Sequence, residues 1–210
     1  MRQQSYSMRQ RAPVSGAVAG APVVKAERAP HAASVIWLTG LSGAGKSTVA
    51  LALYEEMVRR DLPAQCLDGD AIRNLFPGLG FSRDERDAHV VRVGDWASRL
   101  EDEGVTAICA LISPYRQARA QVRRRCRRFF EVYLSTPLHE CERRDPKGLY
   151  ARARRHEIRH FTGVDDPYEP PEAPDLTIDT TFVEVGESVS RIIAAITRRI
   201  RVDATAGFTL

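Results

Sequence analysis

A glycine-rich loop carries the residues whose types and spacing best suit phosphate chemistry. Residues 40–47 read GLSGAGKS, which fits the pattern G-x-x-x-x-G-K-[ST]. Glycines let successive backbone N–H groups turn inward around a polyphosphate. The ammonium of Lys46 would stabilise the transferred phosphate, and the hydroxyl of Ser47 would help to hold Mg²⁺. We therefore expect ATP and Mg²⁺ as ligands, with ATP contacts from Gly40, Leu41, Ser42, Gly43, Ala44, Gly45, Lys46, Ser47 and Thr48.

Two carboxylates form a second candidate site. Asp68 and Asp70 follow a short predicted strand at 64–68. On an extended chain end, side chains two residues apart point to the same side. Asp68 would then assist the metal, while Asp70 would receive the proton of an acceptor hydroxyl and act as a catalytic group. The structural alternative for the pair is a helix N-cap followed by a turn aspartate.

The elements that must position these residues alternate along the chain. Strands are predicted at 34–39, 64–68, 105–112, 129–135 and 176–179. Helices are predicted at 46–60, 83–103, 115–127 and from 185 to about 200. This alternation predicts an α/β fold of the P-loop NTPase type, a doubly wound and mainly parallel five-stranded sheet with helices on both faces. Such sheets bind ligands beyond the carboxyl ends of their strands, where the loop, the two aspartates and Ser113 should meet.

The positive charge of the chain is concentrated near its start. The chain of 210 residues has a net charge of +4, and residues 1–33 carry five basic residues against one acid, so residues 34–210 are neutral. A neutral body argues against a nucleic-acid surface, and no stretch is long enough to span a bilayer. We predict a disordered basic tail at 1–33, a catalytic domain at 34–200 and a C-terminal tail at 201–210; an organellar transit peptide is the alternative for the first segment.

Cysteines, histidines and a run of arginines suggest nothing beyond a reduced protein without zinc. The four cysteines form no C-x-x-C pair, which favours reduced thiols in the cytoplasm. The histidines at 139, 156 and 160 lack metal-ligand spacing. The arginine-rich run at 123–128 would end a surface helix, where solvated cations favour the helix dipole.

Five further segments resemble adenylylsulfate kinases in sequence and in order. They are DGDAIR at 68–73, LGFS at 79–82, ISPYR at 112–116, RDPKGLY at 144–150 and FTGVDDPYEPP at 161–171. The resemblance covers about residues 34–180. It implies transfer of the γ-phosphate of MgATP to the ribose 3′-hydroxyl of adenosine 5′-phosphosulfate (APS). The products would be 3′-phosphoadenosine 5′-phosphosulfate (PAPS) and ADP, in sulfate assimilation. ATP sulfurylase is one partner that it suggests, and a homodimer is one assembly.

The resemblance also implies how APS is held. Arg73, Phe81 and Arg86 match residues that contact APS in the family. An aromatic ring can stack on adenine, and guanidinium groups can match phosphosulfate oxygens. Phe161 would stack against the APS purine. Asp70 would touch the same substrate.

Two more segments receive roles from the resemblance. Ser113 is described in the family as a phosphoserine intermediate, but in-line transfer needs none. We therefore expect its hydroxyl to form a hydrogen bond near the acceptor, beside Ile112. Arg144 and Lys147 would begin a small mobile lid that approaches ATP on closure.

Two departures from the family pattern leave alternatives open. His89 replaces an asparagine that touches APS, and Val91 replaces an arginine. Histidine can donate and accept one hydrogen bond each, so His89 would keep the contact. The lost arginine leaves open a related kinase for a different small-molecule hydroxyl. A low-activity scaffold for a sulfurylase is the other alternative, although the intact Lys46, Ser47, Asp68 and Asp70 argue against it.

Overall fold

A computed structural model describes residues 33–76 and 78–206 of the chain. The predicted N-terminal tail at 1–33, apart from its last residue, lies outside the described residues. The predicted C-terminal tail at 201–210 does so from residue 207 onward.

Five parallel strands form the central sheet, in the order β2-β3-β1-β4-β5. Their bounds are Val35–Thr39 for β1, Ala64–Asp68 for β2, Thr106–Ala110 for β3, Phe129–Leu134 for β4 and Leu176–Ile178 for β5. The predicted sheet is confirmed, and each strand pair within the described residues is parallel. The strand order reverses around β1, which places the loop after β1 at the usual ligand-binding position of such a sheet.

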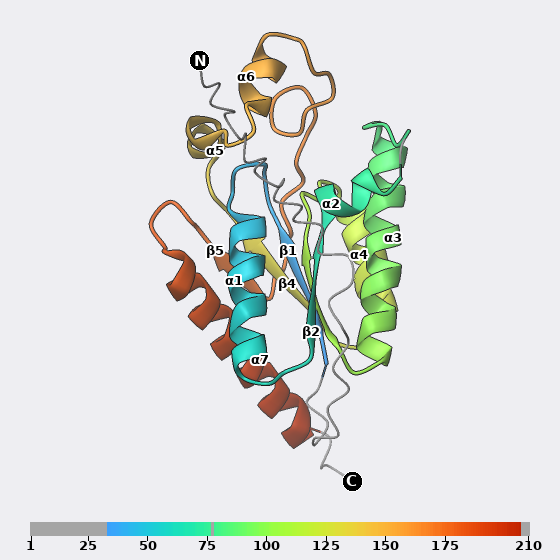
Figure 1. The fold of residues 1–210 in the computed structure, drawn as a ribbon, viewed down its shortest axis with the longest axis vertical. Helices are drawn as coiled ribbons and strands as arrows, with labels where there is room; N and C mark the ends of the chain where they lie inside the picture. The colour runs from blue at the N-terminus through green and yellow to red at the C-terminus, as the bar shows by residue number, and fades with distance from the viewer. Residues whose placement is uncertain (1–32, 77, 207–210) are drawn as a thin grey trace, which may run out of the picture.

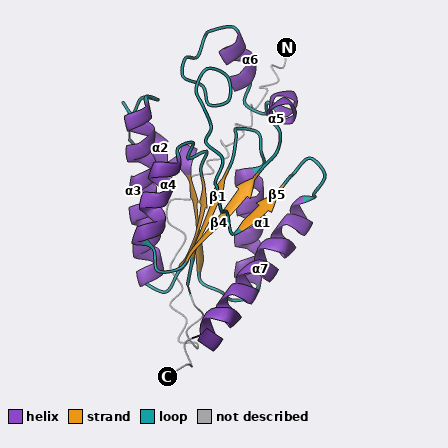
Figure 2. Ribbon diagram, turned by 180° about the vertical axis from the view of Figure 1, so that it is seen from behind, coloured by secondary structure: helices purple, strands orange, loops and turns teal. Residues whose placement is uncertain are grey.

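Helices cover both faces of the sheet, as Figures 1 and 2 show. Helices α1 (Lys46–Arg59) and α7 (Val185–Ala206) lie on one face, and α3 (Arg83–Asp102) and α4 (Arg116–Arg125) lie on the other. Side chains of β1 alternate between the two resulting cores. Ile36 and Leu38 pack toward α1 and α7, whereas Val35 and Trp37 pack toward α3 and α4. A strand buried on both faces explains the continuous apolar run in the sequence.

The last helix is longer than its apolar pattern predicts. The pattern indicates an end near residue 200, but α7 continues to Ala206. The helix thus continues past residue 200, and the boundary between domain and tail stays a prediction.

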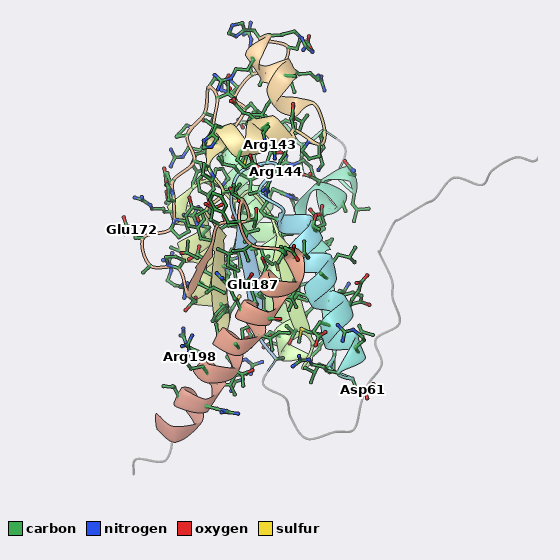
Figure 3. All side chains as sticks on the ribbon, turned by 90° about the vertical axis from the view of Figure 1, so that its left-hand side faces the viewer. Asp61, Arg143, Arg144, Glu172, Glu187 and Arg198 are labelled. Atoms are coloured by element: carbon green, nitrogen blue, oxygen red, sulfur yellow. The ribbon has the colours of Figure 1, made fainter. Side chains whose placement is uncertain are left out.

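Three short helices are absent from the predicted elements. They are α2 (Gly69–Asn74), α5 (Leu138–Arg144) and α6 (Leu149–Arg154). The predicted lid begins at Arg144, the last residue of α5, and leads into α6. Helices of two turns or less are too short for an apolar period to show. Helices α5 and α6 lie beyond the carboxyl edge of the sheet. In Figure 3, Arg143 and Arg144 lie at this end, whereas Asp61 and Arg198 lie at the other. Among the described residues, no helix has the length and apolar character needed to cross a membrane.

Candidate active site

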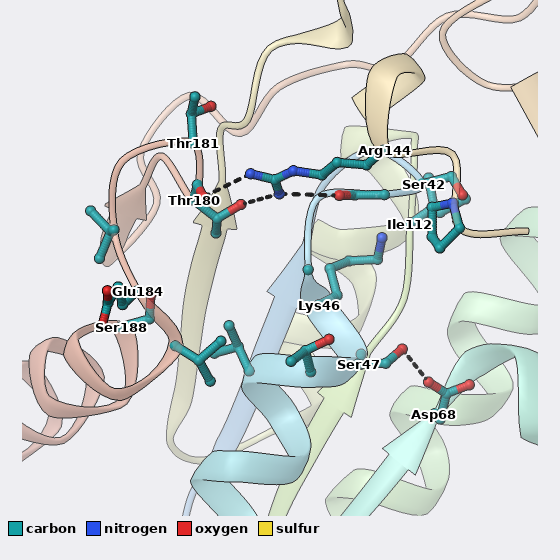
Figure 4. A pocket seen from close by; sticks show the side chains of 18 of the residues that line it. Ser42, Lys46, Ser47, Asp68, Ile112, Arg144, Thr180, Thr181, Glu184 and Ser188 are labelled. Carbon is teal, nitrogen blue, oxygen red and sulfur yellow. Dashed lines mark hydrogen bonds between the residues drawn. The ribbon is translucent and has the colours of Figure 1, made fainter. Parts of the chain in front are cut away.

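A cavity of about 1050 Å³ opens at the carboxyl edge of the sheet. It brings together the phosphate loop, the two aspartates, the end of β3 and the segment that follows β5. Figure 4 shows Lys46, Asp68 and Thr180 around this cavity. The predicted site residues that line it are Ser42, Gly43, Gly45, Lys46, Ser47, Thr48, Asp68, Asp70, Ile112, Arg144 and Lys147. Gly40, Leu41 and Ala44 lie in the same loop without lining the cavity.

The phosphate loop is shaped by positions that accept only glycine. Gly43 and Gly45 have φ angles of 79° and 87°, in the left-handed region. A Cβ atom on Gly43 would also stand 2.8 Å from the carbonyl oxygen of Cys141. The hydroxyl of Tyr150 donates to the carbonyl of Ser42 at 3.0 Å and supports the loop from α6. The loop is therefore held in shape by the protein itself.

Lys46 lies buried beneath this loop. Its Nζ atom donates to the carbonyl oxygen of Leu41 at 2.7 Å. Burial lowers the pKa of Lys46 to about 8, although the negative charge of Asp70 acts in the opposite direction. A buried ammonium with a weakened hold on its proton would be stabilised by a polyphosphate, which supplies the missing negative charge.

Ser47 and Asp68 place two oxygen ligands side by side. The hydroxyl of Ser47 donates to Oδ2 of Asp68 at 2.6 Å (Figure 4). The other carboxylate oxygen, Oδ1, accepts from the backbone N–H groups of Asp70 and Ala71 at 2.9 and 3.1 Å and so caps α2. Asp68 can therefore cap the helix and face a metal ion together with Ser47, because each role uses a different carboxylate oxygen.

The expected extended geometry of the two aspartates is wrong. Asp68 ends β2, but Asp70 already lies in the first turn of α2, since the cap at Asp68 starts a helix there. Both still line the same cavity. Partial burial raises the pKa of Asp70, but the hydrogen bond and charge of Lys147 and the charges of Lys46 and Arg73 outweigh it and lower that pKa. Asp70 is thus a carboxylate that stays ionised at neutral pH.

Arg144 spans the top of the phosphate loop. Its guanidinium donates to Glu140 at 2.8 Å and to the carbonyl of Gly43 at 3.3 Å. It also donates to the hydroxyl and the carbonyl of Thr180, both at 2.8 Å (Figure 4). These contacts engage the edge of the guanidinium plane, so the flat face is the part left for a ligand.

The Ser113 hydroxyl belongs to a buried network. Ser113 is only 2% exposed. Its Oγ atom accepts from Nε1 of Trp37 at 3.1 Å and donates to Oγ1 of Thr39 at 2.9 Å. Arg119 donates to the Ser113 carbonyl at 2.6 Å and holds a backbone whose φ is +40°. This geometry does not support the predicted role beside the acceptor, because the hydroxyl is already satisfied inside the protein. Ser113 instead anchors the loop that carries Ile112 to the cavity.

Phe81 is an exposed ring flanked by two arginines. Its exposure is 54%. The guanidinium carbons of Arg73 and Arg86 lie 4.7 and 5.4 Å from the ring centre. Arg86 is itself buried, donating to the Phe81 carbonyl at 2.8 Å and to Thr162 at 3.1 Å. The three predicted APS contacts therefore form one cluster, although none of them lines the main cavity.

Two further predicted substrate contacts are buried in this structure. His89 is 4% exposed, and its Nε2 atom lies 2.9 Å from the carbonyl oxygen of Gly69. Phe161 is 7% exposed and packs edge-on against Tyr150, with ring centres 5.0 Å apart. Both side chains are packed inside the protein and neither lines the main cavity, so their contact with APS stays a prediction. Val91, the other departure, is half-buried on α3 and does not line the cavity.

One wall of the cavity is formed by residues that the sequence patterns did not predict. This wall follows β5 and consists of Thr180, Thr181, Phe182, Val183, Glu184, Val185, Gly186 and Ser188. The rule that ligands bind beyond the carboxyl ends of parallel strands applies to the fifth strand as well, and would have indicated this segment. Phe182 in this wall is 86% exposed.

The remaining polar features have structural partners. Arg123 pairs with Glu131 and Asp175, Arg125 with Asp95 and Arg127 with Asp102, so three of the five arginines in the run are paired with carboxylates. The four cysteines are free thiols. Within the described ranges, no three His, Cys, Asp or Glu side chains gather as a metal cluster. A cation at this site would therefore need oxygen atoms from its ligand as well.

Comparison with known proteins finds close relatives. The family model for adenylylsulphate kinase matches residues 32–179. An adenylyl-sulfate kinase of Gloeothece citriformis is 50% identical over 159 residues, which are 75% of this chain and 90% of that protein. The structure of the Mycobacterium tuberculosis APS kinase CysC in complex with AMPPNP and APS matches with a TM-score of 0.77 and 40% identity, covering 80% of this chain and 99% of that one. A hexameric APS kinase from Thiobacillus denitrificans matches with a TM-score of 0.63 and 34% identity, covering 81% of this chain and 30% of that one.

Proposed function

We propose a role for each part of the cavity in this chain, which belongs to the adenylylsulphate kinase family. The chain is a kinase that transfers the γ-phosphate of ATP to the 3′-hydroxyl of APS, giving PAPS and ADP. One observation carries the assignment of roles. A single cavity holds a phosphate loop with its lysine, a serine paired with a carboxylate, and a second carboxylate paired with Lys147.

ATP would occupy the phosphate loop and the wall that follows β5. Backbone N–H groups of the loop and the start of α1 suit the phosphates. The base would reach the segment from Thr180 to Ser188, where the flat face of Arg144 can stack on it. Support for ATP comes from the related structure that holds AMPPNP.

Mg²⁺ would be held by Ser47 and Asp68. Hydroxyl and carboxylate oxygens are the ligands that this ion prefers, and it commonly takes the remainder from water and substrate phosphates. The two oxygens are 2.6 Å apart in the protein, so they can face the same ion. Bound there, the ion would neutralise charge on the β- and γ-phosphates.

Asp70 would accept the proton of the attacking hydroxyl. It is ionised, lies in the same cavity as Lys46 and belongs to the first turn of α2. APS would approach past Phe81, whose flanking guanidiniums of Arg73 and Arg86 suit an aromatic and anionic ligand. Lys46 would stabilise the phosphoryl group as it moves between the two substrates.

We further propose that the chain self-associates, as a homodimer or a larger oligomer. Support comes only from the related kinase that is described as hexameric. Light scattering on the purified chain tests this, and a monomer at all concentrations would exclude it. A sulfurylase partner and a cytoplasmic location stay predictions from the sequence.

The central experiment measures PAPS and ADP by chromatography, with ATP and Mg²⁺, with and without APS. We expect ADP release that depends on APS and is matched by PAPS. A panel containing adenosine 5′-monophosphate, gluconate and a 5′-hydroxyl oligonucleotide serves as the control. Faster turnover of any of these than of APS would contradict the assignment and favour the alternative of a different hydroxyl acceptor. Absence of any turnover would favour the scaffold alternative.

A further inference from the structure

His89 makes one defined hydrogen bond, to the turn that carries the two aspartates. It projects from α3, and its Nε2 atom lies 2.9 Å from the carbonyl oxygen of Gly69. A carbonyl oxygen only accepts, so Nε2 must carry the hydrogen. The other ring nitrogen, Nδ1, is buried and finds no hydrogen-bond partner within the described part of the chain. The imidazole is therefore fixed in one tautomer by Gly69.

Gly69 is clamped from two sides. Its carbonyl is held by His89, and its α-carbon faces the side chain of Leu111, because a Cβ atom there would stand 2.7 Å from Cγ of Leu111. Gly69 separates Asp68 from Asp70 and begins α2. The clamp thus acts on the peptide between the proposed metal ligand and the proposed proton acceptor.

We propose that His89 is a positioning residue, whose Nε2–H holds the Gly69 carbonyl and thereby fixes Asp70 relative to the phosphate loop. The proposal rests on the role of Asp70 given above. It differs from the role implied by the family resemblance, in which residue 89 touches APS.

The surroundings of His89 favour this neutral, donating form. Burial lowers the pKa of His89, and the positive charges of Arg73 and Arg92 act in the same direction. Together they outweigh the hydrogen bond to Gly69 and the charge of Asp70, which raise it. A second proton on Nδ1 would place a charge in a buried position beside two arginines. The residue therefore keeps its single donor at neutral pH.

Contact with APS and support of Asp70 affect different kinetic constants. A side chain that binds APS changes its KM, whereas one that positions the proton acceptor changes kcat. Direct contact is disfavoured because Nδ1 is buried and Nε2 is already bound to Gly69.

Two amide substitutions separate these roles. The amide nitrogen of glutamine in His89→Gln can take the place of Nε2, whereas that of asparagine in His89→Asn takes the place of Nδ1. We expect His89→Ala and His89→Asn to lower kcat by about 5- to 30-fold, the scale of one buried hydrogen bond. His89→Gln should restore most of this loss, and KM for ATP and APS should stay within about twofold.

The opposite pattern would overturn the proposal. If His89→Asn matches the unsubstituted chain while His89→Gln and His89→Ala raise KM for APS, residue 89 touches APS. The proposal also fails if all three variants keep full kcat. If His89→Ala does not fold, as thermal melting would reveal, the comparison of the two amide variants still decides between the roles.

A double-variant cycle tests whether the effect passes through Asp70. With Asp70→Asn as the background, His89→Ala should cost less than about twofold in kcat, because the group that it positions is already disabled. An undiminished cost in that background would contradict the proposal. Lack of APS turnover by the unsubstituted chain would instead refute the proposed function, so the two failures are distinguishable.

Discussion

The ammonium nitrogen of Lys147 lies 2.5 Å from Oδ2 of Asp70, which joins the segment between α5 and α6 to the first turn of α2. The two residues are 77 positions apart in the sequence. Both side chains are more than half exposed, so the pair is screened by solvent and adds little to stability. Its consequence is electrostatic, because it places a cation directly on the proposed proton acceptor.

Removal of Lys147 should shift the acid limb of the pH profile upward. Lys147 lowers the pKa of Asp70, and Asp70 works only when it is ionised, so activity disappears as pH falls through that pKa. In Lys147→Met the pKa of Asp70 should rise and activity should be lost at higher pH. The profile of kcat/KM for APS measures this. Arg155→Met, which removes an exposed cation paired with Glu157, is the control. An unmoved acid limb would show that Asp70 is not the titrating group.

Asp70→Asn should separate turnover from nucleotide binding. The amide keeps the shape of the side chain but removes its charge and its ability to accept a proton. We expect kcat to fall by about 10²-fold or more, the scale of general base catalysis, with little change in the Kd for ATP. Steady-state kinetics would measure kcat, and calorimetric titration with AMPPNP would measure nucleotide affinity. An equal collapse of nucleotide binding would assign Asp70 to the metal instead.

Lys46→Ala should lower kcat by about 10²- to 10³-fold, the scale for removing one electrostatic stabiliser of the transition state. The ammonium is buried under the loop and donates to the Leu41 carbonyl. Besides the charges of Asp70 and Asp68, a bound polyphosphate would supply the negative charge that stabilises it. Arg152→Ala, which removes one exposed cation from α6, is the control and should keep its turnover. Retention of most turnover by Lys46→Ala would refute the role of the lysine.

The same residue predicts a basic limb for ATP binding. Burial sets the pKa of Lys46 to about 8, below its ordinary value. The lysine of the free enzyme therefore loses its charge as pH rises through about 8, and ATP binding should weaken over that range. ATP itself favours the charged form, so the pKa should be higher in the complex. The profile of kcat/KM for ATP measures the free-enzyme value. Lys46→Arg, which stays charged, should flatten this limb, and a wild-type profile flat to pH 10 would contradict the prediction.

Ser113→Ala should reduce stability more than activity. The substitution leaves Nε1 of Trp37 without its acceptor inside the protein, which costs about 1–3 kcal/mol in the free energy of unfolding. Turnover should change by less than about tenfold, since the hydroxyl does not reach the cavity. Urea unfolding and PAPS formation measure the two effects, with Ser135→Ala as a control outside the network. Complete loss of activity in a folded Ser113→Ala would support a phosphoserine intermediate.

The sequence by itself determined the fold class, the family and the phosphate loop. Each depends on local order along the chain. Alternating strands and helices carry long apolar patterns, and the loop is a continuous stretch whose glycines and lysine act next to one another. The alternation of Val35, Ile36, Trp37 and Leu38 between two cores follows from a strand buried on both faces, which the apolar run already indicated.

Only the tertiary structure decided how individual side chains are used. Asp70 lies in a helix because Asp68 caps α2, and a six-residue helix leaves no period in the sequence. The hydroxyl of Ser113 and Nε2 of His89 could have faced a ligand, but they bond to Trp37 and Gly69, which are 76 and 20 residues away in the sequence. A polar group bonds to whichever partner the fold brings within about 3 Å. That choice depends on the packing of distant segments, which no local pattern records.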